Sequence, residues 1–278
     1  MARRKRKQDK QNGNKFVVII SLIILVLILA VFVLLPGSKE QSGRNIEGIS
    51  LELAIPQFTK STKSQIIEHV GYTVSYNEQR RNPNWVAYEL TAQEVAGTEP
   101  RGDDFVPDPM VVGRQATTDD YKRSGWDRGH LAPAADMKWS DDAMAESFYM
   151  SNISPQNQNL NRGVWKSIEE LVRENASRHG KLLVVTGPVF TNKKGLGYIG
   201  DNRVLIPNGF YKVLLAYDGE YTGIGFYCEN VAGKKKLTKY ARTIDEIEEL
   251  AGIDFFHMLP DEIETAVESC YQEYEWGL

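Results

Sequence analysis

Residues 126–136 read Trp-Asp-Arg-Gly-His-Leu-Ala-Pro-Ala-Ala-Asp, so that an imidazole, a guanidinium and a carboxylate surround one glycine. The neutral imidazole of His130 can take up a proton near pH 7. Arg128 can hold a phosphate in its fixed fork of donors, and in an extended segment it points to the same face as His130. Gly129 lets the backbone approach a neighbour closely or turn with a positive φ. The pattern indicates hydrolysis of an anionic ester, and it favours a phosphodiester as the substrate.

A simpler interpretation of this stretch has to be weighed. A histidine among apolar residues is more often structural than catalytic, and Asp127 with Arg128 could form a surface ion pair of little consequence. A second motif further along the chain favours the catalytic interpretation. It comprises Ser-Asn-Ile-Ser-Pro-Gln at 151–156, Leu-Asn-Arg-Gly-Val-Trp at 160–165, and Glu169.

Together the two motifs resemble the signature of the DNA/RNA non-specific endonucleases, a family of ββα-metal (His-Me finger) nucleases. The resemblance extends from about residue 71 to about residue 260, and it includes Asn-Pro-Asn-Trp-Val-Ala-Tyr-Glu-Leu at 82–90 and Ile-Asp-Phe-Phe at 253–256. It implies a metal-dependent endonuclease that cleaves DNA and RNA with little sequence preference and leaves 5′-phosphate products.

The resemblance also implies the roles of the main site residues. His130 would be the general base, and Asn161 would be the one side chain that binds Mg²⁺ directly, with Mn²⁺ as an alternative ion. Mg²⁺ keeps several of its waters, so a single amide ligand is chemically reasonable. Arg128 would brace the site and bind phosphate, and Glu169 would act with it as a further catalytic residue.

Four more residues receive supporting roles from the same resemblance. Asn152, together with Glu169, would position water around the ion. Arg173 lies one helical turn past Glu169 and would pair with that carboxylate. Asp127 would lie just behind the residues that contact the metal ion or the substrate, and Arg114 would bind a substrate phosphate.

The N-terminal segment predicts a membrane anchor. Residues 1–15 contain seven basic residues and one acidic residue, and residues 16–35 are uncharged and apolar on all sides, which is long enough to cross a bilayer as one helix. The basic cluster predicts a cytoplasmic N-terminus. We expect a basic segment at 1–15, a transmembrane anchor at 16–36, a linker at 37–49 and a nuclease domain at 50–278 that lies outside the cytoplasm, periplasmic or extracellular. Cleavage of the apolar run as a secretory signal is the alternative.

The charge balance limits how nucleic acid can be bound. The chain has 33 basic and 37 acidic side chains, and 26 basic and 36 acidic remain without the first 36 residues, a net charge of −10. This charge opposes long-range attraction to a polyanion. DNA and RNA, the expected partners, must therefore bind in a local positive cleft. The sequence leaves open a homodimer and a disulfide between Cys228 and Cys270.

The distribution of apolar residues predicts the fold class. Strand composition occurs at 71–76, 85–91 and 181–186, and 210–217 with 221–228 is typical of a hairpin about Asp218 and Gly219. Helices are predicted at 141–149, from about 161 to 179, at 244–251 and at 261–271. This order lacks βαβ regularity, so the class is α+β. The resemblance sharpens it to a central antiparallel sheet flanked by helices, with a strand-loop-helix unit that carries His130 and Asn161.

Two rival functions come from other classes. One is a catalytically idle nucleic-acid-binding protein of the same fold, and the other is a hydrolase of a different extracellular phosphodiester, such as a lipid headgroup. The first is disfavoured because every position that catalysis needs is filled, namely His130, Asn161, Arg128 and Glu169. Competition between plasmid DNA and a small diester substrate would discriminate the second.

Overall fold

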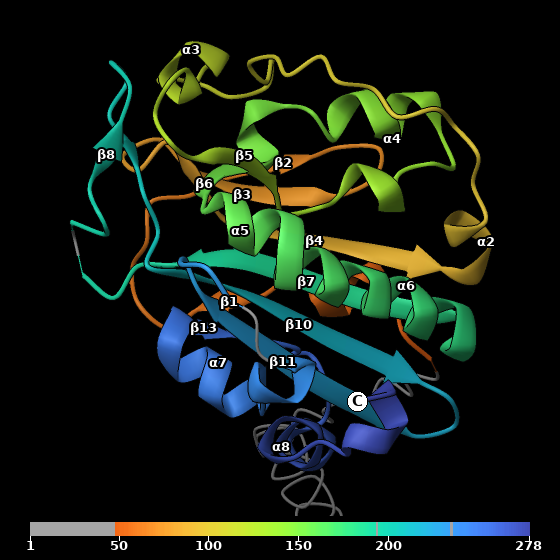
Figure 1. The fold of residues 1–278 in the computed structure, drawn as a ribbon. Helices are drawn as coiled ribbons and strands as arrows, with labels where there is room; N and C mark the ends of the chain where they lie inside the picture. The colour runs from red at the N-terminus through yellow and green to blue at the C-terminus, as the bar shows by residue number, and fades with distance from the viewer. Residues whose placement is uncertain (1–47, 193, 234–235) are drawn as a thin grey trace, which may run out of the picture. The chain divides into compact units, whose positions relative to one another are not determined.

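A seven-stranded antiparallel sheet forms the centre of the computed structural model, which describes residues 48–192, 194–233 and 236–278 (Figure 1). Its strands, in spatial order, are β12 (Ala241–Arg242), β11 (Tyr221–Glu229), β10 (Gly209–Tyr217), β7 (Lys181–Val189), β4 (Asn82–Thr91), β3 (Thr73–Asn77) and β2 (Gln65–Glu68). The expected class, α+β with a central antiparallel sheet flanked by helices, is confirmed.

Both faces of this sheet are covered. One face packs against α6 (Lys166–His179), whose Val172 lies in the larger apolar core. The opposite face packs against α7 (Ile244–Ala251) and α8 (Asp261–Ser269), and Ile247 and Val267 lie in the second core there. A strand between two covered faces must be apolar on both sides, which explains the continuous apolar run of β7.

Shorter elements surround the sheet. The helical ones are η1 (Leu51–Ala54), α2 (Ala92–Val95), α3 (Thr118–Tyr121), η2 (Ala134–Asp136), α4 (Asp141–Glu146), η3 (Met150–Asn152), α5 (Gln158–Leu160), η4 (Asn161–Trp165), η5 (Leu237–Lys239) and η6 (Glu273–Trp276). Three two-stranded pairs join β1 (Gln57–Phe58) to β13 (Ile253–Asp254), β5 (Asp127–His130) to β6 (Ile153–Gln156), and β8 (Tyr198–Ile199) to β9 (Val204–Leu205).

The expected hairpin and the cap of α7 are confirmed. β10 and β11 pair from end to end, with Tyr217 opposite Tyr221, and Gly219 in the turn adopts a φ of +79° that favours glycine. Thr243 and Glu246 form a reciprocal capping box at the start of α7, which explains why that helix begins where the sequence predicts.

The helix expected from about residue 161 differs from the observed one. It begins earlier, because the side chain of Asn157 accepts hydrogen bonds from the backbone of Asn159 and Leu160. It is then interrupted by the π-helical turn η4, in which Gly163 has the non-helical angles φ −110° and ψ −112°. The helix expected at 141–149 is also shorter and ends at Glu146.

The expectations for residues 1–47 lie outside the described residues. Among the residues that the structure does describe, none of the helices combines the length and the apolar character needed to cross a membrane. Cys228 is buried on β11 and Cys270 is exposed after α8, and both are free thiols, so the disulfide left open by the sequence is absent.

Candidate active site

The two motifs meet in a small strand pair followed by a helix. β5 pairs antiparallel with β6 in the register that sets His130 opposite Ile153, and α5 with η4 follows β6 directly. Gly129 is buried against Gln156, and a Cβ at position 129 would overlap that side chain. Only glycine therefore fits between Arg128 and His130, which explains the glycine in the motif.

His130 lies between two aromatic rings. Its ring centroid is 5.3 Å from that of Phe105 and 5.0 Å from that of Phe148. The guanidinium of Arg128 lies 4.1 Å from the Phe105 ring centroid, and that of Arg101 lies 5.3 Å from the Phe148 ring centroid. The imidazole is thus flanked by rings that each carry an arginine on them.

This setting keeps His130 neutral. Burial, followed by the positive charges of Arg101 and Arg128, lowers the pKa of His130 from 6.5 to about 3. Its Nε2 is buried and has no hydrogen-bond partner among the described residues. The imidazole is therefore unprotonated near pH 7 and able to take up a proton.

Asn161 is held by the first residue of β5. Its Nδ2 donates to Oδ2 of Asp127 at 3.0 Å, and Arg162 donates to both oxygens of the same carboxylate at 2.8 Å. With Nδ2 engaged, the Oδ1 of Asn161 accepts no hydrogen bond from any residue that the structure describes. Asp127 therefore fixes the amide so that its oxygen, the atom that a hard cation prefers, is the free end.

Arg128, Asp127, Asn161 and Arg162 line one surface pocket of about 450 Å³, together with Phe105 and four residues of the 118–126 segment. The structure thus brings Arg128 and Asn161, the predicted phosphate-binding and metal-binding side chains of the two motifs, to one opening. His130 adjoins it through its contact with Phe105.

A buried charge cluster lies behind His130. Lys212 is fully buried on β10, and its Nζ donates to Thr186 Oγ1 at 2.6 Å and to the carbonyl oxygen of Leu131 at 3.4 Å. Burial lowers the pKa of Lys212 to about 8, and burial raises that of Glu169 to about 7 although the charge of Lys212 opposes it. Arg101 acts on the pKa of both Glu169 and His130, so the two groups share one electrostatic environment.

The expected pairing of Arg173 with Glu169 is wrong. Nη1 of Arg173 donates to Oδ1 of Asp136 at 2.8 Å, and the hydroxyl of Tyr88 donates to the other oxygen of Asp136 at 2.8 Å. The Asp136 side chain has no exposed surface. Arg173 thus pairs with a carboxylate whose charge no water can stabilise.

Asn152 has contacts other than those expected. Its Nδ2 donates to the carbonyl oxygens of Ala132 and Ser147, each at 2.8 Å, and its Oδ1 accepts from the backbone N–H of Ala132 at 2.9 Å. The side chain is fully buried. These contacts fix the backbone that follows His130, so Asn152 helps to hold His130 in position.

Arg114 contacts none of these residues and interacts with Glu78 instead. It is exposed, its Nε is 3.9 Å from Glu78 Oε1, and its backbone N–H donates to the same oxygen at 3.2 Å. It does not line the pocket that contains Arg128 and Asn161. The structure therefore does not bring Arg114 together with the other predicted site residues.

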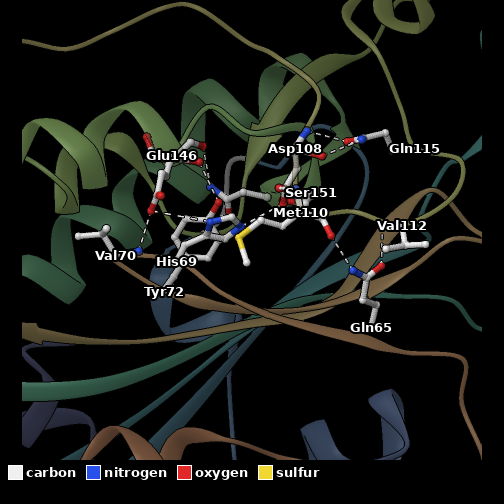
Figure 2. A network of polar contacts seen from close by, with 12 residues as sticks. Gln65, His69, Val70, Tyr72, Asp108, Met110, Val112, Gln115, Glu146 and Ser151 are labelled. Carbon is white, nitrogen blue, oxygen red and sulfur yellow. Dashed lines mark hydrogen bonds and ion pairs between the residues drawn. The ribbon is translucent and has the colours of Figure 1, made fainter.

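A second polar network anchors the loop that carries Arg101 and Phe105, and Figure 2 shows it. Asp108 Oδ2 lies 3.0 Å from His69 Nε2 and accepts from Ser151 Oγ at 2.5 Å. Both the His69 and the Asp108 side chains are fully buried. Because Ser151 directly precedes Asn152, this network ties the loop to the segment that supports His130.

Sequence reasoning missed several residues of this site. The missed residues are Arg101, Phe105, Phe148, Arg162 and Lys212. Arg162 stood inside the quoted motif, and a lysine in the otherwise apolar strand 210–217 is a signal that could have been used. Arg101 and the two phenylalanines reach His130 only through the folding of the chain.

Comparison with known proteins decides the family. The model of the family described as DNA/RNA non-specific endonuclease matches residues 49–262. The chain belongs to this family. Human mitochondrial nuclease EXOG is 33% identical to it over 233 residues, which cover 77% of this chain and 63% of the relative. Bovine mitochondrial endonuclease G is 32% identical over 213 residues, which cover 73% of this chain and 68% of the relative.

The chain is also similar to a further nuclease and to a solved structure. Nuclease C1 of Cunninghamella echinulata var. echinulata is 33% identical over 214 residues, covering 71% of this chain and 85% of the relative. The crystal structure of the EndoG/EndoGI complex matches with a TM-score of 0.69 and 27% identity, covering 77% of this chain and 92% of that chain. This non-specific endonuclease family member spans 56% to 63% of the length of four EXOG relatives.

These comparisons confirm the family that the sequence predicts. The expected localisation, a single-pass membrane protein with its catalytic domain outside the cytoplasm, is wrong. The EXOG and endonuclease G relatives are named as mitochondrial proteins. The apolar run that supplied the topological argument lies outside the described residues.

Proposed function

We propose that this protein is a metal-dependent endonuclease that hydrolyses phosphodiester bonds of DNA and RNA with little sequence preference and leaves 5′-phosphate products. The observation that carries the proposal is the neutral His130, whose Nε2 lacks a partner, beside a pocket lined by Arg128 and Asn161. Family membership supports the same activity.

The residues present fit a hard divalent cation. Asn161 offers Oδ1 because Asp127 holds its Nδ2, and Mg²⁺ needs few protein oxygens because it keeps several waters. We therefore assign Asn161 as the side chain that would hold Mg²⁺ or Mn²⁺. When bound there, such an ion would supply Lewis-acid stabilisation of the phosphate and of the leaving 3′ oxygen.

The chain's own residues supply the rest of the chemistry. The neutral imidazole of His130 takes the proton from the attacking water, because its low pKa keeps the ring unprotonated at neutral pH. Arg128 and Arg101 lie on the two rings that flank the base. They can there offset the charge that develops on the phosphate.

Glu169 and Lys212 set the charge behind this base. Lys212 donates to the carbonyl oxygen of Leu131, directly after His130, and its positive charge opposes the rise in the pKa of Glu169. Lys212 thus favours an ionised Glu169 near neutral pH. An ionised Glu169 can orient water in the site by accepting hydrogen bonds.

The test is cleavage of supercoiled plasmid and of single-stranded RNA with Mg²⁺, with Mn²⁺ and with EDTA. We expect cleavage of both substrates that EDTA abolishes, and products with 5′-phosphate ends. His130→Gln should lose the activity, whereas His257→Ala, which removes a histidine outside the pocket, should keep it. Failure of the folded wild-type protein to cut either substrate with either metal would contradict the proposal.

A further inference from the structure

A group of acidic side chains lies away from the nuclease site, where α7 and α8 meet. Asp245 and Glu248 come from α7 and Glu268 comes from α8, and one carboxylate oxygen of each lies within 4.8 Å of the others. Both helices cover the same face of the sheet and pack beside β11 (Figure 1). None of these residues belongs to the pocket that contains Asn161.

Glu268 is the residue of this group whose buried carboxylate has an oxygen without a hydrogen-bond partner among the described residues. Its side chain is buried, with 6% of the residue exposed, and its Oε1 has no hydrogen-bond partner among the described residues. Glu268 also lies in the last turn of α8, where the helix dipole disfavours negative charge. A buried acidic side chain that has an oxygen without a partner and lies beside two other carboxylates requires a proton or a cation.

The surroundings add more negative charge, and His257, which acts on Glu264, is the one nearby group of opposite sign among the described residues. Burial and the charge of Glu248 raise the pKa of Glu268, and Glu264 and Asp254 raise it further. The resulting pKa is about 9. Burial, and then Asp254 and Asp245, raise the pKa of Glu248 to about 7. Within the described part of the chain, none of these five carboxylates forms an ion pair with a lysine, arginine or histidine.

The spacing suits a single hard cation. Ca²⁺ binds oxygen ligands at about 2.3–2.6 Å, so two of its ligands lie at most about 5 Å apart. The three carboxylate oxygens meet this limit. One oxygen of Glu248 already accepts from the backbone N–H of Phe255 at 2.7 Å, which holds that side chain in place.

We propose that Asp245, Glu248 and Glu268 form a second, structural cation site, selective for Ca²⁺, that ties α8 to α7. The cation would neutralise the buried charge of Glu268 and join the C-terminal helix to the sheet through α7. This site is independent of the nuclease activity, because its ligands touch neither His130 nor Asn161.

The test measures Ca²⁺ binding to the full-length chain with Asn161→Ala, so that the nuclease site contributes little. At pH 8 we expect isothermal titration with CaCl₂ to give one site, and the melting temperature to rise with CaCl₂ concentration. MgCl₂ at the same concentrations should give a smaller rise, because three carboxylates suit a larger and less hydrated ion.

Variants locate the site. Glu268→Gln should raise the melting temperature of the metal-free protein, since it removes buried repulsion, and should weaken Ca²⁺ binding by about tenfold or more, because Ca²⁺ affinity follows ligand charge. Asp245→Asn should also weaken binding, and its exposed position keeps folding intact. Glu249→Gln, a neighbouring exposed control on α7, should bind Ca²⁺ like the parent chain.

Two outcomes would overturn the proposal. One is a parent chain whose melting temperature and titration heats do not respond to CaCl₂. The other is a response that Glu268→Gln and Asp245→Asn both leave unchanged. Plasmid cleavage by Glu268→Gln in the chain with an intact Asn161 should equal that of the wild type, so a failure of this proposal is distinct from a failure of the nuclease assignment.

Discussion

Asp127 is predicted to control metal affinity although it is not itself the proposed ligand. Its carboxylate accepts one hydrogen bond from Asn161 and two from Arg162. The Arg162 side chain is 69% exposed, so that ion pair adds little to stability. The bond from Asn161 is to a charged group and is worth about 1.5–3 kcal/mol. Asp127→Ala removes it and lets the amide rotate.

We expect Asp127→Ala to raise the Mg²⁺ concentration at half-maximal cleavage by about 10–100-fold, the usual effect of losing a group that orients a metal ligand. Arg162→Ala is the matched control, because it removes the ion pair and keeps the Asn161 bond, and its Mg²⁺ dependence should stay near that of the wild type. The assay is the initial rate of plasmid nicking against free Mg²⁺, with circular dichroism to verify folding. An unchanged Mg²⁺ dependence in Asp127→Ala would refute the orienting role.

Three further perturbations test other parts of the site. Asn161→Ala should cut the rate heavily and weaken its Mg²⁺ dependence, and an unchanged Mg²⁺ titration would mean that the ion lies elsewhere. Arg173→Met should lower the free energy of unfolding by about 3–5 kcal/mol, because it leaves the buried Asp136 unpaired; urea denaturation measures this, and a loss below about 1 kcal/mol would count against the pairing. For His130, the folded pKa of about 3 lies below the ordinary 6.5, so the unfolded chain binds a proton that the folded chain refuses, and stability falls as pH drops below about 6.5. This group should remove at most about 2 kcal/mol between pH 7 and pH 5, and His130→Gln should lose that part of the dependence.

The sequence correctly predicted the features that depend on residues close together in the chain. The motif around Gly129 and the hairpin at Gly219 are set by local backbone requirements, and both occur as expected. Asn161 also meets Asp127, because β5 and the turn after β6 are joined by a short strand pair. Local spacing was sufficient for Gly129 and Gly219, whereas a supporting role for Asp127 was implied only by the family resemblance.

Sequence patterns did not predict the side-chain contacts that depend on burial in the folded core. Helical spacing predicted that Arg173 would pair with Glu169, yet the fully buried Asp136, distant in sequence, takes it. Phe105 and Phe148 lie on the two sides of His130 through contacts that no local pattern reveals. The break at η4 likewise depends on Gly163, which the periodicity of the apolar residues does not mark.

The central claim is that His130 acts as the base, and chemical rescue tests it most directly. His130→Gly removes a ring that lies between Phe105 and Phe148, and the space left is suited to free imidazole. We predict that this variant does not cut plasmid in Mg²⁺ alone, and that added imidazole restores cutting at a rate that follows the concentration of its neutral form. Cleavage at the wild-type rate by His130→Gly without imidazole would contradict the account.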